Sequence, residues 1–346
     1  MYPDNGNIIH VVLAVYDPKG TYSQHAGVVV ASIFERTQSR VCVHILHDET
    51  LSNRNRSFFA ETAELFAQKV EFHNVSENMD QLGEETIEIT QKRYWSVGTL
   101  FRLAITDILP LDKVIYLDCD VVVNLDIREL WDISVEGFSF AGVVETHHRP
   151  FSSFTFGKRL MRCDVKKYIN AGVLLMNIPR IKEKFDMRRA FEWFKRYRNY
   201  MEYPDQDMIN SYFRGDIKFI DARFNNYTAN RGGVQLSDVA DSILHATLTK
   251  PWIEPRGSAV DYLYWRAFLK TPWGRLSPEE LIDRMLEVFQ KSPITHRRTG
   301  QCYRKVFHRL GKDIFFSDTL KTAASYLKLL FLEAKYYLTR GESKKK

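Results

Sequence analysis

Along the first 75 residues, short apolar runs typical of strands are followed by segments whose apolar residues have helical spacing. Residues 8–16 (IIHVVLAVY), 42–48 (CVHILHD) and 70–75 (VEFHNV) are short, β-rich apolar runs, whereas residues 25–37 and 51–69 follow helical spacing. Strand and helix therefore alternate. This pattern predicts a mostly parallel sheet with helices on its faces, in which the carboxyl ends of the strands line a ligand crevice.

The next apolar run, residues 114–123 (VIYLDCDVVV), carries two acids around one cysteine. We expect it to be the strand at the middle of the sheet. Two buried carboxylates are costly to desolvate and repel one another, so either a positive group lies beside Asp118 and Asp120 or the strand opens there. On an extended segment the two side chains share a face and could bind Mg²⁺ or Mn²⁺. Such a pair also occurs at solvated strand ends and turns.

Two further segments combine an apolar run with polar side chains. Residues 168–178 (YINAGVLLMNI) read either as a turn before a buried strand, with backbone freedom at Gly172, or as a place where a ligand approaches the backbone near Asn170. Residues 203–210 (YPDQDMIN) predict a helix amino terminus. Asp205 would then be its cap, and Asp207 would lie in the first turn.

His245 and Lys250 lie near the end of another short apolar run, SILHATLTKPW. A single histidine is more often structural than a ligand, and a single lysine is usually a solvated charge. A histidine could also complete an Asp, Asp, His set around Mn²⁺, while Lys250 could neutralise phosphate oxygens. The sequence leaves both alternatives open.

Composition limits the fold class and the compartment. The chain has 346 residues, 45% of them hydrophobic and 27% charged, which suits one large globular domain with a small appendage. Its four cysteines lie far apart, so neither a zinc knuckle nor a disulfide framework is predicted. No window resembles a signal peptide or a membrane-spanning helix. We therefore expect a cytoplasmic protein.

The net charge of +6 is distributed unevenly. Residues 291–346 carry +10 and residues 1–290 carry −4. Helices are predicted at residues 261–270 and 277–290, and residues 317–341 follow the spacing of an amphipathic basic helix. Its apolar face could pack on the main domain or bind an anionic membrane surface. We favour the membrane, and hence a peripheral position on its inner face.

Taken in order, YLDCD, DIRELW, YINAGVLLMN, DQDMIN and LH…KPW resemble the family 8 retaining glycosyltransferases. The resemblance covers about residues 8–252. Bacterial members of this family include galactosyl- and glucosyltransferases of lipopolysaccharide biosynthesis. The resemblance implies a GT-A type fold, a UDP-sugar donor, Mn²⁺ (or Mg²⁺) and transfer of a hexose to a glycan or lipid-linked acceptor with retention. We expect a catalytic domain at residues 1–255 and a helical basic region at residues 256–346.

The resemblance also implies roles for individual residues. The metal ligands would be Asp118, Asp120 and His245. Asp205 and Gln206 would lie near the anomeric carbon and support catalysis. The groups that bind the donor would be Ala14, Tyr16, Asp17, Tyr22, Arg102, Asp118, Cys119, Asn170, Ala171 and Lys250. Arg102 would help hold both the donor and the acid pair. Without the resemblance, Arg102 would be interpreted as an exposed or snorkelling helix residue.

Two departures from the family pattern bear on these roles. The turn VYDPKGTY, which carries Tyr16, Asp17 and Tyr22, is about two residues longer than the family's Asp-x-Asn-Tyr turn, which holds uridine. Tyr22 is then either a residue that stacks on uridine or an ordinary loop tyrosine. The segment between His245 and Lys250 lacks the usual glycine. A nucleotidyltransferase and a UDP-sugar-binding protein with lost or altered catalysis are the alternatives. Nucleic-acid binding is not expected, because no recognition module accompanies the basic tail.

Overall fold

The computed structural model divides into two compact units, which are residues 1–226 with 241–243, and residues 227–240 with 244–346. The residues that the structure describes are 8–80, 96–145, 153–227, 234–247, 249–253, 255, 258–275, 280 and 283. The domain boundary expected after residue 255 stays a prediction, because most of the region beyond it lies outside these residues.

The first unit contains a seven-stranded sheet in the order β3-β2-β1-β4-β7-β6-β8. Its strands are β1 Ile8–Val15, β2 Arg40–His47, β3 Lys69–Asn74, β4 Lys113–Leu117, β6 Phe140–Val144, β7 Ile169–Asn177 and β8 Ile217–Phe219. Strand β7 runs antiparallel to β4 and β6, while the other pairs are parallel. The predicted mostly parallel sheet is therefore confirmed.

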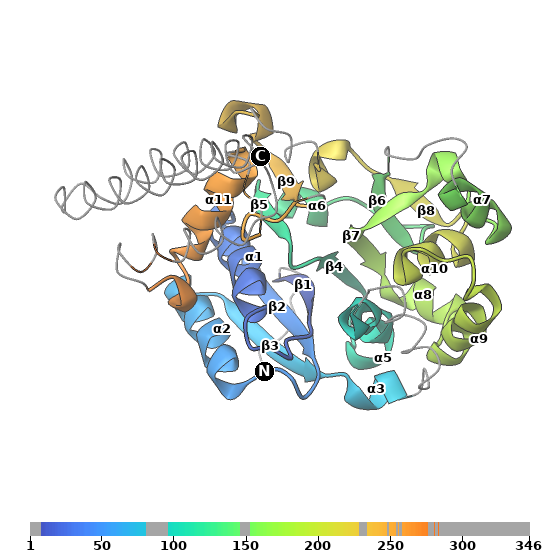
Figure 1. The fold of residues 1–346 in the computed structure, drawn as a ribbon, viewed down its shortest axis with the longest axis horizontal. Coiled ribbons are helices and arrows are strands. Elements are labelled where there is room, and N and C mark those ends of the chain that lie inside the picture. Colours follow the sequence, from blue (N-terminus) through green and yellow to red (C-terminus); the bar gives the residue numbers. More distant parts are fainter. Residues whose placement is uncertain are drawn as a thin grey trace, which may run out of the picture. The chain divides into compact units, whose positions relative to one another are not determined.

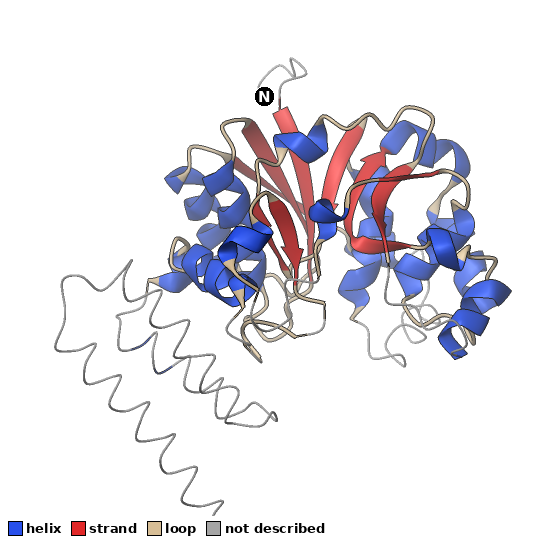
Figure 2. Cartoon of the chain, turned by 90° about the horizontal axis from the view of Figure 1, so that it is seen from above, coloured by secondary structure: helices blue, strands red, loops and turns tan. Residues whose placement is uncertain are grey.

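Helices cover both faces of this sheet (Figures 1 and 2). They are α1 Ser23–Arg36, α2 Asn53–Leu65, α3 Ser76–Asp80, η1 Val97–Ala104, α5 Ile105–Ile108, α6 Arg128–Trp131, α7 Ser153–Leu160, η2 Val165–Lys167, α8 Ile178–Lys184, α9 Met187–Tyr197, α10 Pro204–Tyr212 and η3 Ala222–Asn225. Helices α1 and α2 confirm the two predicted at residues 25–37 and 51–69. On the opposite face, side chains of η1, α5, α8 and α10 join those of β1, β4 and β7 in one apolar core.

The predicted strand at residues 114–123 is split in two. Strand β4 lies at the middle of the sheet, as expected, but it ends at Leu117, and residues 118–120 form a turn. The chain then enters β5 (Val121–Asn124), which leaves the large sheet and pairs with β9 (Ser242–His245). A single strand through both acids is therefore wrong. The break places the charged segment outside the ladder, where the carboxylates avoid full burial.

In the second unit, the described elements are η5 (Leu236–Val239), the end of β9, α11 (Ala259–Phe268) and η6 (Pro272–Gly274). Ser258 and Asp261 form a capping box at the start of α11. This helix confirms the one predicted at residues 261–270. Most of residues 277–290, and all of the amphipathic helix and basic tail, lie outside the described residues.

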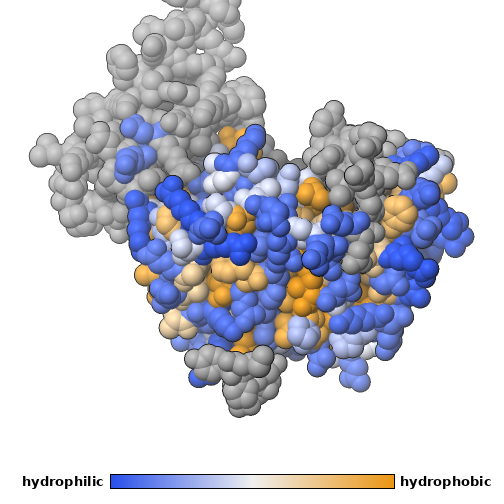
Figure 3. Space-filling model, turned by 90° about the horizontal axis from the view of Figure 1, so that it is seen from below, coloured by the Kyte–Doolittle hydropathy of each residue, from blue (hydrophilic) through white to orange (hydrophobic). Residues whose placement is uncertain are grey.

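Large apolar side chains are exposed at scattered positions. Seven of them are Tyr22, Leu65, Leu160, Tyr200, Tyr212, Phe219 and Ile253. The face in Figure 3 is mostly hydrophilic in its described part, with smaller hydrophobic areas between. Among the described residues, no helix is long and apolar enough to cross a membrane.

Candidate active site

The acid pair is fixed at the carboxyl end of β4. The backbone N–H of Asp118 donates to the Gly172 carbonyl at 2.8 Å. Its Oδ1 accepts from Arg102 Nη2 at 2.8 Å and from the Tyr116 hydroxyl at 3.0 Å. Carboxylate oxygens of Asp118 and Asp120 lie within 4.8 Å of one another. The two side chains therefore converge as predicted, but a turn brings them together and not an extended strand.

Arg102 is the positive group that the acid pair required. It lies on η1 with 6% of its surface exposed. Nε is 3.0 Å from Asp205 Oδ2, Nη1 donates to the Ala171 carbonyl at 2.6 Å, and the guanidinium lies 4.2 Å from the Tyr116 ring centroid. Burial alone would lower the pKa of Arg102, but the negative charges of Asp118 and Asp205 raise it above its ordinary value.

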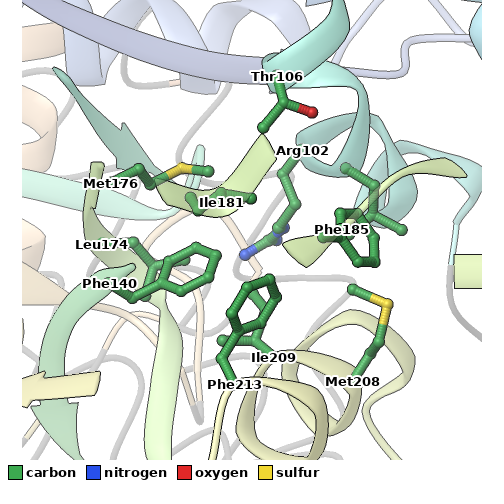
Figure 4. A pocket seen from close by; sticks show the side chains of 11 residues that line it. Arg102, Thr106, Phe140, Leu174, Met176, Ile181, Phe185, Met208, Ile209 and Phe213 are labelled. Carbon is green, nitrogen blue, oxygen red and sulfur yellow. The ribbon is translucent and has the colours of Figure 1, made fainter. Parts of the chain in front are cut away.

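The side chain of Arg102 also borders a cavity that is otherwise mostly apolar (Figure 4). Phe140, Ile209 and Phe213 are among the residues that line it. Low polarity around a guanidinium strengthens its ion pairs, because little water competes for the charges. Arg102 is therefore a buried cross-link between η1, β4, β7 and α10, and the exposed alternative is wrong.

Helix α10 brings Asp205 and Gln206 to this cross-link. The helix begins at Pro204, which suits a first helical position, and Tyr203 is the N-cap residue. The expectation that Asp205 caps the helix is therefore wrong, whereas Asp207 lies in the first turn as expected. Gln206 Oε1 accepts from the Ala171 N–H at 2.9 Å. Burial raises the pKa of Asp205, although Arg102 opposes this shift.

Residues 170–172 lie inside β7, so the alternative of a turn before this strand is wrong. Asn170 Oδ1 accepts from the Gly172 N–H and from Asn225 Nδ2, both at 2.9 Å, and its Nδ2 donates to Glu145 Oε2 at 3.3 Å. The alternation of the strand places Asn170 beside these polar partners. The sequence motifs missed Glu145 and Asn225, because neither belongs to a recognisable pattern.

The loop after β1 is organised by Asp17, which is 1% exposed. Its Oδ1 accepts from the Tyr22 N–H at 2.7 Å. Its Oδ2 accepts from the Ser23 N–H at 3.0 Å, the Ser23 hydroxyl at 2.5 Å and Asn55 Nδ2 at 3.1 Å. Both carboxylate oxygens are thus engaged within the protein, and Asp17 holds this longer turn in shape.

Residues near the end of β1 and in the loop after it contact the acid turn and η1. Cys119 Sγ donates to the Ala14 carbonyl at 3.2 Å, and the Tyr16 ring packs edge-on against Phe101. The pKa of Tyr22 is raised, first because protein atoms surround its hydroxyl and then by the charges of Cys119, Asp120 and Asp118. Although 37% of the whole residue is exposed, the charges of the acid pair act on its hydroxyl. The structure therefore brings the predicted residues of the first unit to one end of the sheet.

His245 and Lys250 belong to the second unit. His245 is buried and is the last residue of β9. Lys250 Nζ donates to the Ala246 carbonyl at 2.6 Å. Their roles as third metal ligand and phosphate-binding residue stay predictions.

Comparison with known proteins identifies relatives of the chain. The sequence model described as glycosyl transferase family 8 matches residues 14–254. A putative glycosyltransferase of Haemophilus influenzae is 30% identical over 205 residues, which are 59% of this chain and 60% of that protein. The lipopolysaccharide 1,3-galactosyltransferase of Salmonella typhimurium is 24% identical over 263 residues, which are 71% of this chain and 74% of that protein.

A solved structure has a similar fold. It is the galactosyltransferase LgtC in complex with donor and acceptor sugar analogues. The match has a TM-score of 0.63 and 22% identity, and it covers 80% of this chain and all of that one. At this identity, the likeness concerns the fold alone.

Proposed function

The chain belongs to glycosyl transferase family 8, and from this premise we propose that it transfers a hexose, galactose or glucose, from a UDP-sugar to a glycan or lipid-linked acceptor with retention. Its fold is the GT-A type, as expected from the sequence. The observation that carries the proposal is the pair of carboxylates within 4.8 Å of each other at the end of β4, held by Arg102.

The donor set of this pair suits a hard divalent cation. Carboxylate oxygens are the ligands that Mg²⁺ and Mn²⁺ prefer, and Asp118 is 28% exposed, so it remains open to a ligand. Asp118 and Asp120 would hold the ion. His245 is our third ligand, because it belongs to the family motif LH…KPW. When bound, Mn²⁺ would neutralise charge on the departing diphosphate.

The remaining residues bind the donor and stabilise the leaving group. Departure of UDP breaks the bond between the anomeric carbon and the phosphate oxygen, which keeps the electron pair. Lys250 supplies positive charge to that oxygen as a compact ammonium. Ala171 donates its N–H to Gln206, and its carbonyl accepts from Arg102, which pairs with Asp205. We place the donor sugar beside these groups and the adjacent Asn170. Arg102 fixes these groups relative to Asp118.

Retention requires the acceptor to arrive on the face that UDP leaves. Gln206 is an amide, which is a poor nucleophile, and Asp205 is buried in an ion pair with Arg102. We therefore favour same-face attack. The acceptor hydroxyl oxygen bonds to the anomeric carbon and gives its proton to a phosphate oxygen of UDP, while Gln206 and Asp205 support the positive charge on the sugar.

The first test is donor hydrolysis. The purified protein is offered UDP-galactose, UDP-glucose and other UDP-sugars with Mn²⁺ or EDTA, and released UDP is measured. We expect Mn²⁺-dependent turnover, and we expect Asp120→Ala to abolish it. The control is Asp107→Ala, at an exposed acid in α5, which should preserve turnover. Turnover with nucleoside triphosphates and not with UDP-sugars would replace the proposal by a nucleotidyltransferase.

The stereochemical step has its own test. With a slow donor analogue, intact-protein mass spectrometry should detect no covalent adduct. A glycosyl group trapped on Asp205 or Gln206 would overturn same-face attack and leave the transferase proposal intact.

A UDP-sugar-binding protein with altered catalysis is the second candidate. The observation in its favour is the longer turn after β1, where both carboxylate oxygens of Asp17 are engaged by the protein itself. Calorimetry distinguishes the two candidates. Tight Mn²⁺-dependent binding of a UDP-sugar, without hydrolysis or transfer to any of several glycan acceptors, would favour the binding protein.

For the acceptor, we propose a lipid-linked or lipopolysaccharide-type saccharide presented at a membrane. The support is the net charge of +10 on residues 291–346. Removing these residues should abolish sedimentation with anionic liposomes, with UDP release unchanged. Unchanged sedimentation would exclude this region as a membrane contact.

A further inference from the structure

A row of imidazoles crosses the first three strands of the sheet, apart from the candidate active site. His10 lies on β1, His44 on β2 and His73 on β3. The strand register pairs His44 with Val12 on β1 and with Glu71 on β3. His10 lies two residues before Val12, and His73 lies two residues after Glu71. Because side chains alternate along a strand, the three histidines and Glu71 point to one face. His10 Nδ1 is 2.9 Å from His44 Nε2, and His44 Nδ1 is 3.0 Å from His73 Nε2.

Three of these side chains enclose a point suited to a metal ion. His44 Nδ1 is 3.0 Å from His73 Nε2 and 3.3 Å from Glu71 Oε2, while the latter two atoms are 3.9 Å apart. The circle through three points at these separations has a radius of about 2.0 Å, which agrees with bond lengths of about 2.0–2.2 Å from Zn²⁺ to nitrogen and carboxylate oxygen. The three ligand atoms are therefore already spaced for one ion.

Neighbouring groups already orient these ligand atoms. Lys69 forms an ion pair with Glu71 Oε1, which turns Oε2 toward the histidines. His10 Nδ1 faces His44 Nε2, so the Nε2–H of His44 can donate to it and leave the Nδ1 lone pair for a metal.

We propose that His44, Glu71 and His73 bind one Zn²⁺ ion, with a water molecule as the fourth ligand. Two imidazoles and one carboxylate favour Zn²⁺ over Mg²⁺ and Mn²⁺. His44 is buried, whereas the side chains of His73 and Glu71 are 21% and 36% exposed, so solvent can supply the water and a path of entry. Binding replaces the hydrogen bond between His44 and His73, and the His73 proton moves from Nε2 to Nδ1.

Cys42 lies on the same face but is not part of the proposed ligand set. Its thiol groups with His10 and His44, whereas the proposed ligand set groups His44 with Glu71 and His73. The site is also distinct from the acid pair. Strand β3 lies three strands from β4 in the sheet, which corresponds to about 14 Å at the usual strand spacing.

The position of the site suggests what the ion does. Strand β3 is at the edge of the sheet, it pairs with β2 alone, and none of its six residues is fully buried. Zn²⁺ would join His44 on β2 to Glu71 and His73 on β3. We therefore assign the ion a structural role, the attachment of an edge strand, which is independent of sugar transfer.

The test measures zinc in full-length protein without a histidine tag. An Asp120→Ala background weakens metal binding at the candidate active site. Both the Asp120→Ala protein and a double variant that also carries His73→Ala are treated with EDTA and dialysed against Zn²⁺. Inductively coupled plasma mass spectrometry should find one more zinc per chain in the Asp120→Ala protein than in the double variant. Glu71→Gln should weaken binding at least tenfold. The matched control is Glu49→Gln, at an exposed acid beside Asn74, and it should bind as the background does.

Hydrogen exchange supplies a readout that does not depend on a variant that folds poorly. Zn²⁺ should slow exchange of backbone amides in residues 69–74 and leave those in residues 169–177 unchanged. Equal zinc content with and without His73→Ala, or exchange in β3 that does not respond to Zn²⁺, would show that the row is a hydrogen-bonded cluster only. Neither result would bear on the UDP-release assay.

Discussion

Asp205 and Asp207 lie two residues apart in α10, yet each belongs to a different buried charge cluster. The Arg102 cluster consists of Arg102, Asp118, Asp205 and Tyr116. The Lys158 cluster consists of Lys158, Asp207 and Tyr168. Both place a cation over an aromatic ring and against a carboxylate, with the Lys158 ammonium 5.0 Å from the Tyr168 ring centroid. Their chemical composition is thus nearly the same.

The two clusters differ in exposure. Lys158 and Asp207 are 1% and 0% exposed, whereas Asp118 is 28% exposed and continues into the acid turn. Asp207 also accepts from the backbone N–H groups of Glu202 and Tyr203, which fixes the start of α10. A closed cluster can only stabilise the fold. An open one can exchange contacts with a ligand, so we assign the Lys158 cluster to stability and the Arg102 cluster to function.

The largest effect is expected from Lys158→Met. This change leaves the Asp207 carboxylate in the interior without its cation, and losing one partner of a buried pair costs about 3 kcal/mol or more. Urea denaturation should show this loss in the free energy of unfolding. Lys195→Met, at an exposed position of α9, is the control and should change it by less than about 0.5 kcal/mol. A loss below about 1 kcal/mol for Lys158→Met would contradict the structural assignment.

In the open cluster, Arg102→Lys should affect function more than stability. An ammonium cannot reach Asp118, Asp205 and the Ala171 carbonyl together, because it lacks the planar fork of the guanidinium. We expect UDP release to fall at least about tenfold, which is about 1.4 kcal/mol. The unfolding free energy should fall less than in Lys158→Met. Arg128→Lys, at a 30% exposed arginine, is the control. Full activity in Arg102→Lys would remove Arg102 from the site.

One matched pair of changes compares the clusters directly. Tyr116→Phe removes the hydroxyl that donates to Asp118 at 3.0 Å, and Tyr168→Phe removes the one that donates to Asp207 at 2.5 Å. Tyr168→Phe should cost about 1.5 kcal/mol of unfolding free energy, because its charged acceptor is fully buried. Tyr116→Phe should instead weaken Mn²⁺ binding, measured by electron paramagnetic resonance, by up to about tenfold. The same profile for both variants would mean that exposure does not separate the clusters.

Much of the fold could be predicted from apolar periodicity. The first three strands and two helices follow directly from it, and the motif order predicted the GT-A fold. The break after Leu117 was harder to predict, because Val121–Asn124 is as apolar as the strand before it. Periodicity does not report which sheet a strand joins. The partner of β5 comes from β9, more than 100 residues later in the chain.

The candidate site was predictable where a motif carried it. The charge of the acid pair requires a cation nearby, the family resemblance pointed to Arg102, and the structure places Arg102 against Asp118. Similarly, the sequence places both acids of DQD at the start of one helix, yet the helical rotation between Asp205 and Asp207 directs them to different clusters. Lys158 and Asn225 belong to no motif, and sequence offers no signal for a partner so distant along the chain.

The smallest effect is expected at a third acid, Asp216. Its carboxylate accepts hydrogen bonds from Arg180, Lys184 and the Ser139 hydroxyl. The side chains of Arg180 and Lys184 are 33% and 39% exposed. Burial alone would raise the pKa of Asp216, but these partners hold it below its ordinary value. Its stabilising contribution is therefore present above the unfolded-state pKa of about 3.8 and lost as pH falls through the lower folded-state pKa.

We expect Asp216→Asn to cost about 1 kcal/mol at pH 7, because solvent screens its exposed partners. The difference from wild type in urea denaturation should shrink at pH 3. Asp132→Asn, at a 61% exposed acid, should show no difference at either pH. A loss as large as that of Lys158→Met would mean that the number of charged contacts, and not their exposure, sets the stability of these clusters. The division between closed and open clusters would then fail.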